Sequence, residues 1–271
     1  MYKIIVCDLD ETLLNSEKKI CQENIEAIKK AKALGVKFIP ATGRGYTSID
    51  YVLKTLDLYD QEGEYAITNN GAIVVENKGF RELSCHGLSN EIAMEIVEFG
   101  LKNSLCIQVF TAKNVYAFNV DEDEAKWLFM FKPDAILCSN EDTEFLKSKN
   151  IVKVMFQHTD VKYLATFTDQ LSDRIKGATT ISYSSNRYME FTAKGINKGV
   201  ALKELAQLLG VNLEETLAIG DNNNDLAMLK TAGVSAAVGN ALQEVKEFCD
   251  YQAVRTNEDG AVAVIIEKYI F

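Results

Sequence analysis

Strand-like and helix-like segments alternate at both ends of the chain, and this alternation limits the fold more than any other feature of the sequence. At the N-terminal end, the apolar run "KIIVCD" precedes a helical stretch over residues 21–34, and "VKFIPA" follows as a second strand. A helix over 47–56 and the strand "YAITN" come next. Strands that alternate with helices in this way form parallel sheets with right-handed crossovers.

The C-terminal part resumes the same alternation. Strands are expected over "TLAIGD" and "VSAAVG". Helices are expected over "NKGVALKELAQLLG", "DLAMLKTAG", "ALQEVKEF" and "AVAVIIEKYIF". The two ends therefore predict one α/β core with a Rossmann-like parallel sheet, built from residues 1–84 and 189–271.

The middle of the chain has a different pattern. Paired strands such as "LCIQVF" and "VYAFNV", or "TTISYSS" and "RYMEF", are joined by short segments rich in turn residues, which is typical of hairpins. Two amphipathic helices, near 90–102 and 161–171, lie between the strands. We therefore expect an inserted α+β domain over residues 85–188, a cap on the core. We also expect Trp127, Phe129 and Phe131 in the core of this insertion.

Composition and charge exclude two classes of partner. The chain has 47% hydrophobic and 25% charged residues, as ordinary globular proteins do. Its formal net charge is -10 at pH 7. Nucleic acids and anionic membranes are bound by basic faces, so we expect neither as a partner. An anionic substrate must instead be bound by local cations.

The cysteines and the lack of long apolar segments bear on location. The six cysteines form no Cys-x-x-Cys pair, which favours free thiols in a reducing compartment. No leader pattern precedes the first strand, and no window reaches the length of a membrane span. We expect a cytoplasmic protein that is a monomer or a weak homodimer.

Two carboxylates follow the first apolar strand directly. In "IIVCDLDETLL", Asp8 and Asp10 stand at the C-terminal end of the strand, where open α/β sheets bind ligands. Two carboxylates this close repel each other unless a cation or a shared proton offsets the repulsion. A solvated turn, or Asp10 as a helix cap, is the alternative that this stretch alone leaves open.

Three further polar clusters stand at the ends of core elements. "PATGR" ends the second strand with Thr42 and its neighbours, and "GINKG" places Lys198 in the first turn of a helix. "IGDNNNDLAML" ends a later strand with Asp221 and Asp225. Each cluster alone is typical of a turn or a cap. Because strand ends converge in an α/β sheet, the four clusters together predict a phosphate and magnesium site.

The chemistry of phosphoester hydrolysis needs these residue types. A carboxylate nucleophile divides the reaction into two displacements through an acyl phosphate. It needs help to approach a phosphate dianion, because like charges about 4 Å apart cost several kcal/mol in a partly desolvated site. Oxygen ligands suit Mg²⁺ better than zinc. A lysine and a threonine hydroxyl stabilise the transferring group. A second acid protonates the leaving alkoxide and later activates water.

The same segments resemble a known family. "DLDETLL", "ATGR", "NKG" and "GDNNND" resemble, in order, the four motifs of the haloacid dehalogenase (HAD) superfamily of phosphatases. "ITNNGA" and "MEFTAKGINKG" are similar to its Cof-like branch, of the HAD-IIB type. In that branch a large α/β cap is inserted between the second and third motifs. The resemblance covers essentially the whole chain.

The resemblance implies a role for each motif residue. Asp8 is the implied nucleophile and Asp10 the implied acid/base. Mg²⁺ is implied on Asp8, the backbone carbonyl of Asp10 and Asp221, with Asp225 supporting the metal site. Glu11 stands where the branch usually has glycine. The implied phosphate contacts are the Leu9 backbone, Thr42, Gly43, Lys198 and Asn224.

These observations predict a Mg²⁺-dependent phosphatase of small phosphorylated metabolites that acts through a phosphoaspartate, with sugar phosphates as the leading class. A sugar phosphomutase of the same fold is one alternative, distinguished by whether phosphate is released. A receiver-like phosphoryl-accepting signalling protein is the other, but its usual single compact domain does not explain the insertion. Specificity is expected from a small set of side chains, mostly in the insertion. These candidate substrate contacts are Arg44, Tyr183, Arg187, Tyr188 and Glu190.

Overall fold

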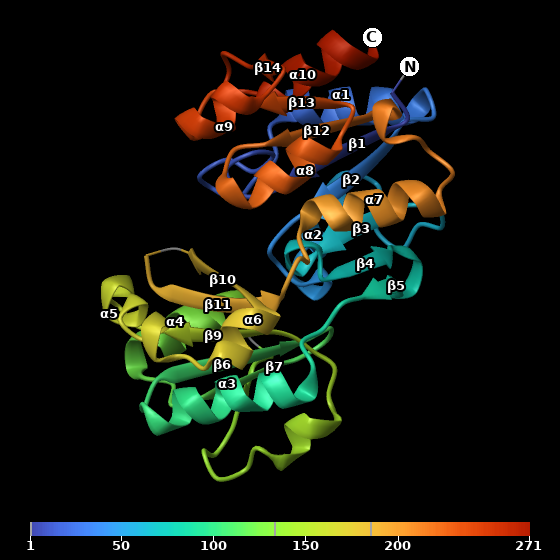
Figure 1. Cartoon of the computed structure of the whole chain (residues 1–271). Helices are drawn as coiled ribbons and strands as arrows, with labels where there is room; N and C mark the ends of the chain where they lie inside the picture. Colours follow the sequence, from blue (N-terminus) through green and yellow to red (C-terminus); the bar gives the residue numbers. More distant parts are fainter. Residues whose placement is uncertain (1, 133, 185) are drawn as a thin grey trace. The chain divides into compact units, whose positions relative to one another are not determined.

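The chain divides into two compact units (Figure 1). A computed structural model describes residues 2–132, 134–184 and 186–271. The first unit joins Met1–Ser84 to Asn197–Phe271, and the second unit is Cys85–Ile196. The confirmed fold class is α/β, with a largely parallel sheet in the first unit.

The expected end of the insertion at residue 188 is wrong. Strand β11 (Tyr188–Ala193) pairs antiparallel with both β9 (Ile151–Gln157) and β10 (Thr179–Ser184). It is therefore an inner strand of the second unit's sheet, and that unit continues to Ile196.

The sheet of the first unit has the strand order β14-β13-β12-β1-β2-β3-β4-β5. Strand β1 is buried along its whole length and runs parallel to both of its neighbours, β2 and β12. Its apolar residues therefore occupy the middle of the sheet, as a continuous apolar run predicts. The strands are β1 (Ile4–Asp8), β2 (Lys37–Ala41), β3 (Tyr65–Thr68), β4 (Ile73–Glu76), β5 (Arg81–Cys85), β12 (Thr216–Gly220), β13 (Val234–Ala237) and β14 (Tyr251–Gln252).

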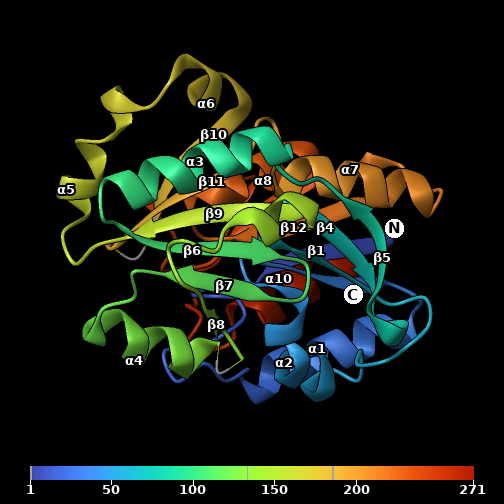
Figure 2. The same ribbon diagram turned by 90° about the horizontal axis from the view of Figure 1, so that it is seen from below.

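Helices cover both faces of this sheet. Figure 2 shows α1 and α2 on one side of β1 and β2, and α7 and α8 on the other. The helix expected over 47–56 is divided at Ile49, where ψ is 8°, into a 3-10 turn and α2. The helices are α1 (Gln22–Ala33), α2 (Asp50–Thr55), α7 (Lys198–Leu208), α8 (Leu226–Thr231), α9 (Gln243–Phe248) and α10 (Ala261–Ile270), with 3-10 turns η1 (Tyr46–Ser48), η2 (Asn69–Gly71), η3 (Lys78–Phe80), η6 (Leu213–Glu215) and η7 (Asn223–Asp225).

The second unit is an α+β body with the strand order β10-β11-β9-β6-β7-β8. One face of its sheet contributes apolar residues to a core that also includes α3, whereas alternate positions carry polar side chains such as Gln108 and Lys153. The remaining strands are β6 (Cys106–Thr111), β7 (Val115–Phe118) and β8 (Ile136–Leu137). The helices are α3 (Asn90–Lys102), α4 (Glu122–Phe131), α5 (Val161–Ala165) and α6 (Asp173–Ala178), with 3-10 turns η4 (Glu144–Ser148) and η5 (Thr168–Gln170).

Two expectations for the second unit are wrong. The helix expected over 161–171 is divided into α5 and η5. The side chains of Trp127 and Phe129 are exposed rather than in the core, because α4 turns Glu124 and Leu128 inward, one helical turn apart. The side chain of Phe131 lies outside what the structure describes. No helix among the described residues is long and apolar enough to cross a membrane.

Candidate active site

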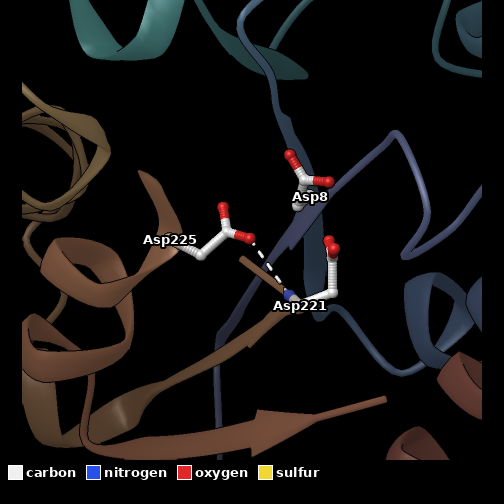
Figure 3. Close-up of side chains that lie close together, drawn as sticks. All are labelled: Asp8, Asp221 and Asp225. Carbon is white, nitrogen blue, oxygen red and sulfur yellow. Dashed lines mark hydrogen bonds between the residues drawn. The ribbon is translucent and has the colours of Figure 1, made fainter. Parts of the chain in front are cut away.

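Three buried carboxylates meet at the C-terminal edge of the first unit's sheet (Figure 3). Asp8 is the last residue of β1, and Asp221 directly follows the last residue of β12, which is its neighbour in the sheet. Asp225 ends the 3-10 turn that follows. One carboxylate oxygen from each residue lies within 4.8 Å of the other two. The carboxyl ends of neighbouring parallel strands lie at the same edge of the sheet, and these predicted site residues are therefore close together.

Asp225 organises the loop that carries Asp221. Its Oδ2 accepts hydrogen bonds from the backbone N–H of Asp221 at 3.0 Å and of Asn222 at 3.2 Å. A Cβ on Gly220 would lie 2.7 Å from the side chain of Asp225, so a glycine is needed at the end of β12. This carboxylate is fully buried, and its position supports its expected role behind the metal site.

Lys198 joins two of the three carboxylates. It is the fully buried first residue of α7, whose N-cap Asn197 accepts hydrogen bonds from the N–H groups of the first turn. Its Nζ donates to Asp8 Oδ1 and, at 2.7 Å, to Asp225 Oδ1. Burial opposes the charged form of Lys198, but the two carboxylates outweigh burial and raise its pKa.

The cluster carries more negative charge than Lys198 offsets. Burial raises the pKa of Asp8 well above its ordinary value; Lys198 lowers it, whereas Asp225 and Asp221 raise it further. Burial also raises the pKa of Asp221 to about 7, although Thr12 Oγ1 donates to its Oδ1 at 2.6 Å. A divalent cation would relieve this repulsion, and a buried all-oxygen donor set fits a hard cation such as Mg²⁺. The residues present therefore fit the expected metal.

Asp10 lies in a different environment from Asp8. Arg44 binds its carboxylate with two hydrogen bonds, from Nε to Oδ2 at 2.8 Å and from Nη2 to Oδ1 at 2.6 Å. Lys18 Nζ donates to Oδ1 at 3.0 Å. Burial alone would raise the pKa of Asp10, but the bonds and charges of Arg44 and Lys18 outweigh it and lower the pKa. The pKa values of the two carboxylates are thus moved in opposite directions: burial and like charge raise that of Asp8, whereas two cations lower that of Asp10.

The loop after β2 is joined to the loop after β12 through Asn70. Thr42 is buried, and its Oγ1 accepts a hydrogen bond from the N–H of Arg44 at 3.1 Å. Asn70 donates its N–H to the carbonyl of Thr42, and its Oδ1 accepts from Asn224 Nδ2 at 3.3 Å. A Cβ on Gly43 would lie 3.1 Å from the same Oδ1. These contacts place the expected phosphate ligands Thr42, Gly43 and Asn224 around one residue, Asn70.

Sequence reasoning missed three residues that the structure places at the site. They are Thr12, which binds Asp221; Lys18, which binds Asp10; and Asn70, which joins the two loops. Asn70 lies within the "ITNNGA" segment, so the family resemblance held a signal for it. Nothing in the local pattern distinguishes Lys18 from the adjacent Lys19.

The expected substrate contacts of the second unit each have partners within that unit. Arg187 Nη2 donates to Glu124 at 2.7 Å, and Tyr188 donates its hydroxyl to the same carboxylate at 3.1 Å. Glu190 is buried and accepts from Lys153 Nζ at 2.8 Å. A further hydrogen bond, 2.6 Å long, joins the hydroxyl of the exposed Tyr183 to that of Thr168. Their role in specificity stays a prediction.

The comparison with protein families decides the identity of the chain. Residues 5–266 match the model of the haloacid dehalogenase-like hydrolases. The chain belongs to this family. The predicted enzyme class, a phosphatase of the HAD superfamily, is thereby confirmed, and the motifs that suggested it lie within the matched region.

Individual relatives span the chain from end to end. The putative phosphatase YxeH of Bacillus subtilis is 32% identical over 267 residues, covering 98% of each chain. The 5-amino-6-(5-phospho-D-ribitylamino)uracil phosphatase YcsE of the same species is 29% identical over 266 residues, covering 97% of this chain and 94% of YcsE. Among solved structures, a haloacid dehalogenase-like hydrolase from Bacteroides thetaiotaomicron is 29% identical, with a TM-score of 0.88 and full coverage of both chains.

Glu11 departs from the family pattern at a strained backbone position. Its φ is 62°, in the left-handed region that costs a non-glycine residue roughly 1–2 kcal/mol. Replacement by glycine would remove this cost. Glycine also loses more conformational entropy on folding, however, which offsets roughly 0.5–1 kcal/mol of the stabilisation. We therefore expect Glu11→Gly to raise the free energy of unfolding by about 0.5–1 kcal/mol.

Urea denaturation of this HAD hydrolase measures that difference. Glu11→Ala is the matched control, because it removes the same charge but keeps a side chain in the left-handed conformation. An equal increase in the free energy of unfolding of Glu11→Ala would show that the effect comes from removing the Glu11 charge near Asp221, rather than from relief of backbone strain.

Proposed function

We propose that this HAD hydrolase is a Mg²⁺-dependent phosphatase of small phosphorylated metabolites, with sugar phosphates as the leading substrate class, and that it acts through a phosphoaspartate. One observation carries the proposal. Asp8, at the end of β1, is hydrogen-bonded to Lys198 and lies in a cluster of carboxylates that needs a cation. Lys198 supplies a positive charge that can bind phosphate beside the Asp8 carboxylate. A bound cation would relieve the repulsion between Asp8 and the neighbouring carboxylates.

The proposed reaction has two displacements. In the first, a carboxylate oxygen of Asp8 forms a bond to phosphorus while the ester P–O bond breaks, and Asp10 gives a proton to the leaving oxygen. In the second, Asp10 takes a proton from water as the water oxygen attacks phosphorus, and the bond between Asp8 and phosphorus breaks. The products are the alcohol and inorganic phosphate.

The other residues of the site bind the phosphate and the metal. Lys198, the Thr42 hydroxyl, the Asn224 amide and the backbone N–H groups of Leu9 and Gly43 are the proposed phosphate donors. Asp8, Asp221 and the backbone carbonyl of Asp10 would hold Mg²⁺, which supplies positive charge that reduces the repulsion between nucleophile and phosphate. Asp225 stays bonded to Lys198 and to the loop.

The sequence and the relatives also support the proposed substrate class, location and partners. The relative YcsE is named as a phosphatase of a compound that carries a ribityl phosphate, which favours a phosphorylated polyol or sugar here. The six cysteines, which all lie among the described residues, form no disulfide, which supports a cytoplasmic location. The acidic net charge supports small metabolites, rather than nucleic acids or membranes, as partners of a monomer or weak homodimer.

A screen of phosphorylated metabolites for released phosphate tests this function. We expect release in Mg²⁺, no release after chelation with EDTA, and recovery when Mg²⁺ is added back, because the acidic cluster then regains its cation. Full activity after rigorous metal removal would refute the proposed mechanism. Isomerisation of a sugar phosphate without phosphate release would instead support the phosphomutase alternative.

A further inference from the structure

A short segment near the end of the chain, residues 240–242, is bonded to two loops of the candidate active site. One loop follows β1 and the other follows β12. Asn240 Nδ2 donates to the carbonyl of Glu11 at 2.7 Å, across 229 positions of sequence. The N–H of Leu242 donates to the carbonyl of Asp221 at 2.9 Å. This segment therefore holds the backbone of both loops.

The two bonds hold the backbone at both ends of the hydrogen bond between Thr12 and Asp221. Thr12 is fully buried, and its Oγ1 donates to Asp221 Oδ1 at 2.6 Å. The carbonyl of Glu11 and the N–H of Thr12 belong to one planar peptide group, so a bond to the carbonyl sets the orientation of Thr12. The N–H of this peptide is held weakly, since it lies 3.4 Å from the carbonyl of Leu9. The bond from Asn240 is therefore the stronger of the two.

The amide of Asn240 has a defined orientation. Its Oδ1 accepts from the N–H of Asn257 at 3.0 Å, so its Nδ2 is the end that meets Glu11. Asn257 is buried, and its own Nδ2 donates to the carbonyl of Leu14 at 3.0 Å, farther along the loop after β1. Two asparagines thus anchor this loop, and each is bonded to the other.

Glu11 needs such an anchor because its backbone is strained. Its φ is 62°, in the left-handed region. A non-glycine residue keeps this conformation where surrounding bonds determine it. Loss of the bond from Asn240 would let the peptide turn toward an ordinary conformation, and the Thr12 hydroxyl would then leave Asp221.

We propose that Asn240 is a positioning residue for the metal site. It aligns the peptide between Glu11 and Thr12, so that the Thr12 hydroxyl holds the Asp221 carboxylate in the orientation that binds Mg²⁺. The inference rests on the proposed function, in which Asp221 is a ligand of the metal. Residues that orient a metal ligand contribute to affinity although they do not touch the ion. Asn240 lies outside the four motifs that carry the family resemblance.

The competing view is that Asn240 only stabilises the fold, and Asn77 offers a matched bond for comparison. Asn77 Nδ2 donates to the carbonyl of Leu58 at 3.1 Å, so it also joins an asparagine amide to the backbone of a distant loop. The N–H of Asn77 donates to the carbonyl of Glu64, just before β3. This bond therefore lies at the opposite end of the parallel strands from the site.

The test is titration calorimetry of the metal-free protein with Mg²⁺ alone. We expect Asn240→Ala to raise Kd roughly 3- to 10-fold, about the factor that one net hydrogen bond contributes. Asn77→Ala should change Kd by less than about 2-fold, because it lies far from the site. The Mg²⁺ concentration for half-maximal phosphate release should rise with Kd in Asn240→Ala, while kcat at saturating Mg²⁺ changes by less than about 2-fold. Thermal denaturation in EDTA checks that each variant is folded.

A double-mutant cycle separates a role through Thr12 from any other role. Thr12→Val removes the hydroxyl and should itself raise Kd by roughly 10-fold, as other losses of a group that orients a metal ligand do. Because Asn240 acts through Thr12, Asn240→Ala should cause no further loss of Mg²⁺ affinity in the Thr12→Val background.

Three results would each overturn the inference: an unchanged Kd in Asn240→Ala, an equal rise in Asn77→Ala, or a loss that persists in Thr12→Val. If the wild-type protein binds Mg²⁺ and releases phosphate while Asn240→Ala binds Mg²⁺ normally, the positioning role alone fails. If the wild-type protein neither binds Mg²⁺ nor releases phosphate, the proposed function fails and this inference falls with it.

Discussion

Replacing Asp8 with asparagine should remove turnover and at the same time stabilise the metal-free protein. An amide cannot form the acyl phosphate, so we expect the rate to fall by roughly 10⁵-fold, in the range seen when a nucleophile is removed. Asparagine keeps the size and shape of the side chain. Lys198 keeps its bond of 2.7 Å to Asp225, so the site stays assembled.

The stabilisation follows from the raised pKa of Asp8. Burial is its main cause, with Asp225 and Asp221 adding to it. An acid whose pKa is higher in the folded state than in the unfolded state destabilises the fold as the pH rises above the unfolded value. At pH 7 the neutral asparagine avoids this cost, and a gain of about 1 kcal/mol would raise Tm by roughly 2–4 °C.

Rate assays and thermal denaturation in EDTA measure the two effects on one sample. Asp57→Asn is the matched control: Asp57 is an exposed carboxylate whose pKa is lowered by its hydrogen bond to Lys29, so its loss should not stabilise the protein. Mg²⁺ should raise the Tm of the wild-type protein more than that of Asp8→Asn, because the variant has lost a ligand. Turnover by Asp8→Asn near the wild-type rate would remove Asp8 from the mechanism.

Local sequence pattern predicted the elements and strand ends of the site, because both depend on short-range features. The buried run before Asp8 sets a central strand, and Asn197 before Lys198 marks a helix start. Parallel pairing of β1 with β12 then places Asp8 near Asp221 without further information. The α/β class and the inserted body follow from the same periodicities.

Side-chain direction after the strand end could not be predicted in this way. Period-2 alternation would turn Asp8 and Asp10 to the same side, but β1 ends at Asp8 and the loop folds back, with the N–H of Leu13 bonded to the carbonyl of Leu9. Asp10 is thereby free to meet Arg44. Thr12 meets Asp221 across 209 positions of sequence, a pairing that local patterns do not encode.

The C-terminal boundary of the second unit could not be predicted from local sequence patterns either. The strand Tyr188–Ala193 is apolar enough to belong to either sheet. Its assignment depends on its partners, β9 and β10, and the choice of partner is a property of the assembled sheet.

Asp10 and Asp221 should fail in different ways when replaced. Asp10→Asn keeps the backbone carbonyl that the family resemblance assigns to the metal and loses the proton-transfer group. We expect it to retain much of the Mg²⁺ affinity but to lose roughly 10²- to 10⁴-fold in rate, and less with an aryl leaving group of low pKa. Asp221→Ala removes a metal-binding carboxylate, so the Mg²⁺ concentration for half-maximal rate should rise, by roughly 10-fold or more.

Rate measured against Mg²⁺ concentration, with an alkyl and an aryl phosphate for both variants, separates the two roles. The contrast is sharp because the surroundings of the two carboxylates differ. Asp10 is bonded to two cationic side chains, whereas Asp221 accepts from the neutral Thr12 hydroxyl and lies beside Asp8 and Asp225. A carboxylate already neutralised by arginine and lysine has little further attraction for a metal ion, while one surrounded by like charge has much. If Asp10→Asn showed mainly a Mg²⁺ defect with no dependence on the leaving group, the two assignments would have to be exchanged.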